Sequence, residues 1–149
     1  MATATMMMLT GCGDNSKKEA DKLLEEARTL FEQGDLNAAR KGIDSLRKTY
    51  PNIVEARKGA LKLHQEIELK QAQEDLQVTD SLLQLANLEL ETMQKQVDEH
   101  KKALKATPEE LTALTKMRVQ RDSIRTQFEA LGLKIRYIRQ KQKEGKSEE

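Results

Sequence analysis

The sequence predicts an all-α fold, in which a short helical hairpin leads into a long antiparallel coiled-coil hairpin. Leucine-rich heptads run from Leu69 to Gln142, and such a repeat buries a narrow apolar stripe against a partner helix. Charged residues make up 34% of the chain and aromatic residues 3%, a composition typical of exposed helices around a thin core. No alternating run of β-branched and aromatic residues indicates a strand.

The N-terminal segment has a pattern of its own. Residues 1–11 are small, apolar or hydroxylated, and the first charged residue is Asp14. Leu9-Thr10-Gly11-Cys12 resembles the lipobox of bacterial lipoproteins, with the single cysteine of the chain at the lipidated position. The resemblance implies cleavage before Cys12, a diacylglycerol on its thiol and an acylated amine, which together give stable membrane anchoring. We therefore expect residues 1–11 to be a truncated signal peptide and residues 12–15 to be a lipidated tether.

Two details of this segment refine the expectation. A signal peptide begins with a basic region, but no Lys or Arg precedes Cys12, so we expect the true start to lie upstream. In lipoprotein sorting an Asp directly after the lipidated cysteine favours the inner membrane. Here Gly13 follows Cys12, so the resemblance favours the outer membrane and leaves open whether the protein faces the periplasm or the surface. The alternative is a cytosolic N-terminus with Cys12 unmodified.

Capping signals divide residues 16–64 into a helical base of three predicted helices. A Ser or Asn with Glu three residues later indicates a helix start, Gly followed by Asp indicates a stop and a new cap, and the residue before Pro is disfavoured in a helix. The signals are Ser16 with Glu19, Gly34-Asp35, Tyr50-Pro51, and Asn52 with Glu55. The third helix would then bury Ile53, Val54, Ala56, Ala60 and Leu61.

This base resembles a tetratricopeptide repeat followed by the first helix of a second repeat. The residues that match the repeat spacing are Ala27, Leu30, Phe31, Gly34, Asp35, Leu36, Ala39, Ile43 and Pro51. The Tyr50-Pro51 ending is similar to that of the outer-membrane assembly lipoproteins of the BamD type, which are also lipid-anchored. Repeat proteins need three or more units to bury a continuous core, so we do not expect a peptide groove built from several repeats.

Residues 65–143 predict the coiled-coil hairpin, with a turn at 105–107 and a disordered tail at 144–149. The predicted seam holds Leu69, Ala72, Leu76, Thr79, Leu83, Ala86, Leu90, Met93, Val97, His100 and Leu104 in the first arm, and Leu114, Met117, Arg121, Ile124, Phe128, Leu131, Ile135 and Ile138 in the second. If the chain reverses at Thr107, Leu83 faces Leu131. Thr107-Pro108, with Glu110 at the third helical position, predicts a capped helix start.

The first arm carries four apolar residues outside its seam: Val78, Leu82, Leu85 and Leu88. They would either widen the core of the hairpin or form a surface for a partner protein or a second copy of the chain. An exposed apolar patch marks an interaction site only if it is large. We treat the four residues as a possible partner surface.

The remaining residues exclude several classes of function. A net charge of +1 gives no general attraction to nucleic acid, and one cysteine excludes a multi-cysteine metal site. His64 and His100 have no cysteine or carboxylate pair at ligand spacing. The chain has no phosphate-binding glycine loop, nucleophile elbow or zinc-binding helix motif. We therefore expect no catalysis, cofactor, metal or small-molecule substrate.

These observations favour a membrane-anchored envelope lipoprotein that acts as a non-catalytic helical adaptor or scaffold for another envelope protein. In this hypothesis Cys12 carries the lipid anchor and the hairpin supplies the contact surface. The alternative hypothesis is a cytosolic coiled-coil scaffold that self-associates, with Cys12 unmodified.

Overall fold

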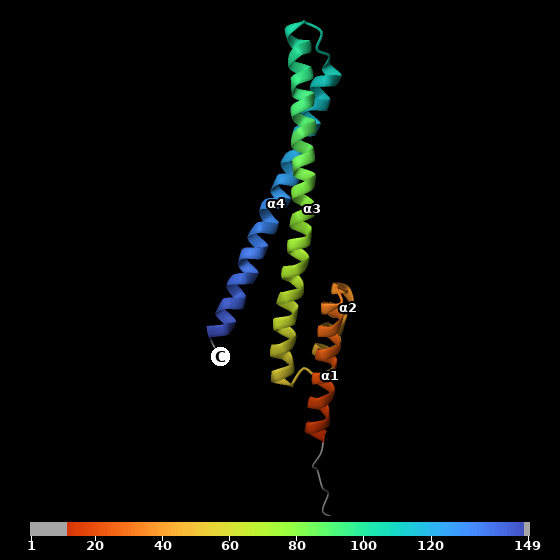
Figure 1. Ribbon diagram of the computed structural model, residues 1–149, viewed down its shortest axis with the longest axis vertical. Coiled ribbons are helices and arrows are strands. Elements are labelled where there is room, and N and C mark those ends of the chain that lie inside the picture. The colour runs from red at the N-terminus through yellow and green to blue at the C-terminus, as the bar shows by residue number, and fades with distance from the viewer. Residues whose placement is uncertain (1–11, 148–149) are drawn as a thin grey trace, which may run out of the picture. The chain divides into compact units, whose positions relative to one another are not determined.

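Helices account for nearly all of the protein in the computed structural model, which describes residues 12–147 and the side chains of residues 15–145. They are α1 (Cys12–Glu32), α2 (Leu36–Thr49), α3 (Val54–Lys102) and α4 (Pro108–Ser147), and the described residues form no strand (Figure 1). The predicted all-α fold is confirmed. The chain divides into two compact units, Met1–Glu68 (unit 1) and Leu69–Glu149 (unit 2). Helix α3 contributes residues 54–68 to unit 1 and residues 69–102 to unit 2.

The junction between α1 and α2 follows the sequence signals. Gly34 has a φ of +87°, the left-handed conformation that glycine adopts at little cost. Its amide donates to the Phe31 carbonyl and the Asp35 amide donates to the Leu30 carbonyl, each over 3.0 Å, which is a Schellman motif. The Asp35 carboxylate accepts the amide hydrogen of Ala38 over 2.9 Å. The predicted stop and cap are therefore confirmed.

The core of unit 1 is built from small and aliphatic residues of α1, α2 and the first part of α3: Ala20, Ala27, Leu36, Ala39, Ile43, Leu46, Ala56, Ala60, Leu63 and Ile67. Two glycines determine how closely these helices approach α1. A Cβ atom at Gly42 would lie 3.0 Å from the Cβ of Ala27, and one at Gly59 would collide with Cδ2 of Leu24. The sequence analysis missed both glycines, because nothing local distinguishes a glycine at a helix contact from one on the surface.

The first helix begins earlier than predicted. Helix α1 starts at Cys12, so residues 12–15, predicted as a lipidated tether, are helical. The capping box predicted from Ser16 and Glu19 is also wrong, because both residues lie inside α1. The Glu19 carboxylate instead accepts hydrogen bonds from Nδ2 of Asn15 over 3.1 Å and from the hydroxyl of Tyr50 over 2.6 Å. These bonds link Glu19 to the preceding turn and to the end of α2.

The third predicted helix is present, but its buried face differs. Helix α3 begins after Ile53, whose carbonyl accepts the amide hydrogen of Arg57 over 3.0 Å, so Asn52 is not the cap. The residues of α3 buried in unit 1 are Ala56, Ala60, Leu63 and Ile67, a set with helical spacing. Val54 and Leu61, predicted for the core, fall outside this face and are 54% and 50% exposed. The predicted Tyr50-Pro51 stop is confirmed, since α2 ends at Thr49.

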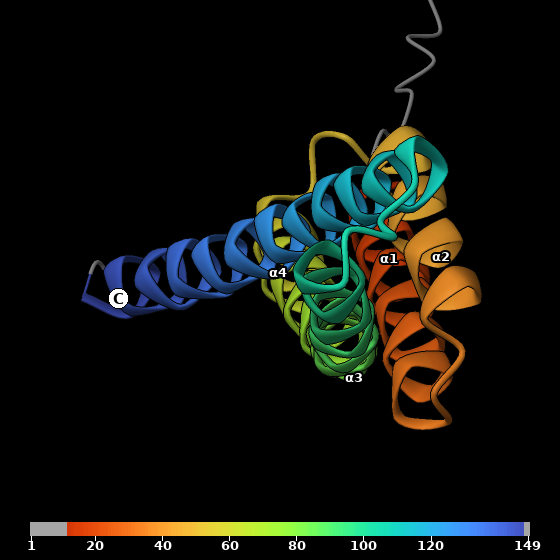
Figure 2. The ribbon, with the colours of Figure 1, turned by 90° about the horizontal axis from the view of Figure 1, so that it is seen from above.

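In unit 2, α3 and α4 run antiparallel and cross obliquely, joined by the turn at residues 103–107 (Figures 1 and 2). Every predicted seam residue is buried or half-buried except Leu104. Leu104 is 95% exposed and has a φ of 57°, because α3 ends at Lys102 and the chain is already turning. The turn therefore starts two residues before the predicted range of 105–107.

Apart from Leu104, the residues of the seam were predicted correctly, but their pairing was not. Leu131 lines a groove together with Thr79, and Nη1 of Arg121 donates to Oδ1 of Asn87 over 3.3 Å. These contacts fit a register about four residues, or one helical turn, earlier in α3 than the predicted one, so the pairing of Leu83 with Leu131 is wrong. The physical reason is the turn, which reverses the chain sooner than predicted.

The C-terminal end of α4 also differs from the prediction. The helix continues through Ser147, so residues 144–147 are not disordered, while residues 148–149 lie outside the described part of the chain. The Glu144 carboxylate accepts hydrogen bonds from Nζ of Lys141 over 2.7 Å and from Nε2 of Gln140 over 2.9 Å. Pairs at these spacings stabilise a helix and support its last turns here.

Candidate functional site

One face of the hairpin exposes large apolar side chains. Val78, Leu82, Leu85 and Leu88 of α3 are between 49% and 62% exposed. They recur at intervals of three or four residues and so form a stripe along the helix. The sequence analysis singled out these four residues, and their exposure distinguishes a surface stripe from a wider hairpin core.

Two shallow grooves lie between this stripe and α4. The first has a volume of about 510 Å³ and an apolar floor that includes Val78 and Leu131, with Asp75 and Lys134 also lining it. The second has a volume of about 420 Å³ and is lined by Leu82, Leu85, Met117 and Ile124, with Glu89 beside them. We call the stripe with its two grooves the groove face. It combines apolar side chains from both helices with charged residues at its rim.

The other side of the seam is closed by polar side chains. Arg118 donates from Nη2 to Oε1 of Gln94, and Arg121 donates from Nη1 to Oδ1 of Asn87. Asn87 and Gln94 are seven residues apart, so they share one side of α3, and the helical repeat puts that side across the seam from Leu82. The hairpin is thus bridged by hydrogen bonds on one side and open and apolar on the other.

The turn of the hairpin is held by a capping box. The Thr107 amide donates to Oε2 of Glu110 over 3.0 Å, and the Glu110 amide donates to the Thr107 hydroxyl over 3.2 Å. The predicted cap at Thr107 is confirmed. Nδ1 of His100 lies 2.7 Å from Oε1 of Glu110. The hydrogen bond from the Thr107 amide lowers the pKa of Glu110, and the bond to His100 lowers it further.

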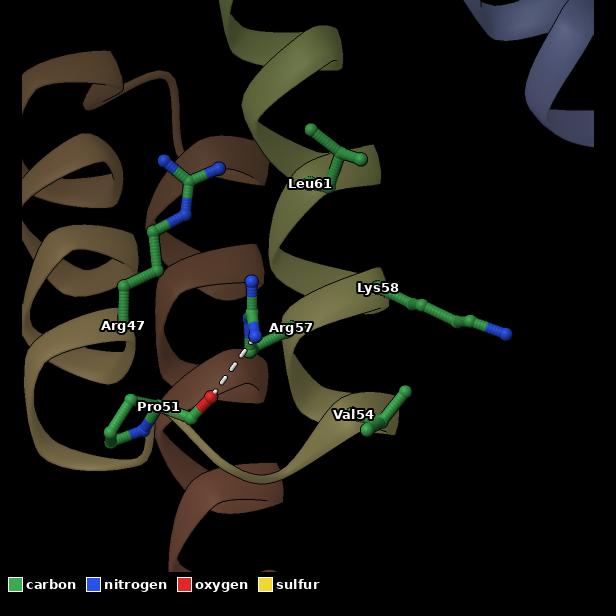
Figure 3. A pocket seen from close by; sticks show the side chains of 6 residues that line it. All are labelled: Arg47, Pro51, Val54, Arg57, Lys58 and Leu61. Atoms are coloured by element: carbon green, nitrogen blue, oxygen red, sulfur yellow. Dashed lines mark hydrogen bonds between the residues drawn. The ribbon is translucent and has the colours of Figure 1, made fainter.

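Unit 1 contains a separate pocket of about 650 Å³ that sequence reasoning missed. Figure 3 shows the side chains of Arg47 of α2 and Arg57 of α3 on one side of the pocket, with the Lys58 side chain pointing away from both. Pro51, Val54 and Leu61 supply its apolar surface, and Arg57 donates from Nη1 to the Pro51 carbonyl over 3.2 Å. No local signal could have located it, because its residues come from α2, from the connection after α2 and from α3, and meet only when the helices pack.

The predicted lipidation site lies at the edge of the described chain. Cys12 is the first residue of α1, its side chain is outside the described part, and Leu9, Thr10 and Gly11 are outside it as well. Among the described residues, no helix has the length and apolar character needed to cross a membrane.

The histidines considered as metal ligands are far apart in the sequence and lie in different units. Residue His64 belongs to unit 1, and His100 of unit 2 contacts Glu110. Within the part of the chain that the structure describes, no group of three or more His, Cys, Asp or Glu side chains could hold a metal ion.

Comparison with protein-family models, with curated proteins and with solved structures finds no match for this chain.

Proposed function

We propose that this protein is a membrane-anchored lipoprotein of the bacterial envelope that acts as a non-catalytic helical adaptor for another envelope protein. The observation that supports the adaptor role is the groove face, where Val78, Leu82, Leu85 and Leu88 remain exposed beside two grooves. The support for the anchor is the resemblance of Leu9-Thr10-Gly11-Cys12 to a lipobox. Gly13 after the cysteine favours the outer membrane.

The geometry of the groove face suits a helix as the bound element. A helical ligand docks by inserting apolar residues, spaced three, four and seven apart, into a groove between two helices. The apolar stripe of α3 has the same spacing, and the open side of the seam would receive the third helix. The charged rim residues Asp75, Glu89 and Lys134 would set its orientation, because rim charges contribute more to specificity than to affinity.

A second candidate is a cytosolic scaffold that self-associates through α3, with Cys12 unmodified. The observation that favours it is again the exposed stripe, because a second copy of α3 could cover Leu82 and Leu85. The two candidates differ in the chemistry of Cys12 and in the identity of the molecule that covers the stripe.

The anchor is tested by labelling cells with a radioactive fatty acid. We expect the wild-type protein to take up label and to sediment with membranes in high salt, and the Cys12→Ala variant to lose both properties. Label, or membrane sedimentation in high salt, that persists in Cys12→Ala would exclude the lipid anchor at this residue.

The adaptor role is tested with a photo-crosslinking amino acid placed at Leu85 and, as a control, at Val119, which is 65% exposed on the outer side of α4. We expect a different protein to be captured from position 85 and not from position 119. Capture of a second copy of the chain would favour the self-associating scaffold. Equal capture from both positions would show that the groove face is not the binding surface.

A further inference from the structure

The pocket of unit 1 gathers positive charge that no carboxylate neutralises. Arg28 and Arg40, elsewhere in unit 1, pair with Glu66 and Glu68. Among the described residues, by contrast, no ion pair is formed by Arg47, Arg57 or Lys58, the three cations that line the pocket. The segment 47–62 holds five Lys and Arg residues and one acidic residue. The pocket is therefore a local positive site in a chain whose net charge is close to zero.

The same pocket exposes apolar side chains. Val54 and Leu61 are about half exposed and lie on the pocket surface with Pro51 (Figure 3). Guanidinium groups bind phosphate oxygens through paired N–H donors, while exposed apolar side chains gain by entering the boundary between lipid headgroups and acyl chains. Cations beside exposed aliphatic side chains thus match the surface of an anionic bilayer better than a soluble anion, which would leave Val54 and Leu61 in water.

The pocket also lies at the end of unit 1 that carries Cys12. The hydrogen bond from Tyr50 to Glu19 sets the end of α2 beside residue 19 of α1, and the contact of Gly59 with Leu24 sets the start of α3 along the same stretch. Cys12 precedes Glu19 by seven residues, which span roughly 10 Å of helix. That separation is about one Debye length at physiological ionic strength, so cations there still experience the surface potential of a membrane.

We propose that this pocket binds the phosphate headgroups of anionic phospholipids in the membrane to which Cys12 is attached. Arg47 and Arg57 receive the phosphate, Lys58 adds a second positive contact at the rim, and Val54 and Leu61 enter the interface. The choice of a bilayer rests on the proposed lipid anchor, because the anchor is what brings the pocket to a membrane. The function that follows is to fix the orientation of unit 1 on the membrane instead of leaving it to rotate about the lipid chains.

The test uses the full chain without its lipid, as the Cys12→Ser variant, so that binding cannot come from the acyl chains. Cosedimentation is measured with phosphatidylcholine vesicles that contain or lack phosphatidylglycerol. We expect binding only to the vesicles with phosphatidylglycerol, and weaker binding as salt rises. Each cation near a membrane surface strengthens membrane binding by a factor of roughly five. The triple variant Arg47→Gln/Arg57→Gln/Lys58→Gln should therefore bind the vesicles about a hundredfold more weakly.

A matched control removes three charges elsewhere. Lys101→Gln/Lys102→Gln/Lys105→Gln, beside the turn of unit 2, changes the net charge by the same amount and should leave vesicle binding within about a factor of two. An equal loss in both triple variants would overturn the proposal, because the attraction would then depend on net charge and not on the pocket. Equal binding to both kinds of vesicle would overturn it as well. Fatty-acid labelling of the wild-type protein reports the anchor independently, so failure of the anchor and failure of the pocket give different results.

Discussion

The hydroxyl of Tyr50 donates a hydrogen bond to the Glu19 carboxylate over 2.6 Å and ties the end of α2 to α1. This bond and the nearby negative charge raise the pKa of Tyr50 above its ordinary value of 10.0, with the hydrogen bond as the larger cause. The reason is that the phenol can donate to the carboxylate only while it is protonated.

We expect Glu19→Gln to lower the pKa of Tyr50 toward 10, because the negative charge that opposes ionisation is removed. The measurement is the absorbance of tyrosinate as a function of pH, made in a Tyr137→Phe background so that Tyr50 is the only tyrosine that titrates. Glu25→Gln, which removes a charge from the same helix, serves as the control and should leave the titration unchanged. An identical titration with and without the Glu19 carboxylate would show that the bond does not form in solution.

Two helical glycines should respond in different ways to the same substitution. Replacing glycine with alanine inside a helix stabilises it by about 1 kcal/mol, and Gly132 of α4 should show this gain because no atom lies within 4 Å of a new Cβ. At Gly42 the new Cβ would lie 3.0 Å from the Cβ of Ala27. Crowding between α1 and α2 should therefore destabilise the fold by about 1 kcal/mol or more and offset the gain in helix stability. Chemical denaturation measures both changes.

Ala27 and Gly42, which meet at the α1–α2 contact, allow the crowding to be tested directly. If crowding is the cause, Ala27→Gly should cost less in the Gly42→Ala background than in the wild type, and a double-mutant cycle would show a coupling of at least about 0.5 kcal/mol. Additive effects of the two substitutions would mean that the helices do not approach each other at this point.

The register of the hairpin can be tested with pairs of cysteines in the Cys12→Ser background. Leu131 lines a groove with Thr79, so Thr79→Cys/Leu131→Cys should form a disulfide under mild oxidation. Leu83 lies one turn further along α3, and in the structural register Leu83→Cys/Leu131→Cys should react much more slowly, since a disulfide requires Cα atoms within about 7 Å. Faster closure of the second pair would restore the register first predicted from the sequence.

This register shows what the sequence could and could not determine. The heptad pattern located nearly every seam residue from Leu69 to Ile138, since the burial of each depends only on its own helix face. Pairing is a different matter, because sliding one arm by about one helical turn, from one seam position to the next, again brings apolar residues opposite apolar residues. The turn decides between the two registers, and the left-handed conformation of Leu104 was not predictable from a side chain that rarely adopts it.

The two candidate sites also differ in whether the sequence alone could predict them. The stripe at Val78, Leu82, Leu85 and Leu88 was predictable because it depends on helical spacing alone. The pocket in unit 1 was not, since it brings Arg47 of α2 together with Arg57 of α3 and depends on how the helices pack. The close contacts of Gly42 and Gly59 escaped prediction for the same reason.

The capping box at the turn should make the hairpin sensitive to acid. The pKa of Glu110 is lower in the folded state than its ordinary value of 4.5, mainly because its carboxylate accepts the Thr107 amide hydrogen and secondarily because it contacts His100. A carboxylate with a lowered folded pKa contributes stability that is complete above the unfolded pKa and is lost as the pH falls through the folded pKa. We therefore expect thermal stability to decline below about pH 4.5 by more in the wild type than in Glu110→Gln, which keeps a capping side chain but cannot titrate.

Glu91 and Glu144 also have lowered pKa values and titrate in both proteins, so the difference between the two curves isolates Glu110. Parallel curves from pH 7 to pH 3 would mean that the capping box contributes nothing to the stability of the turn.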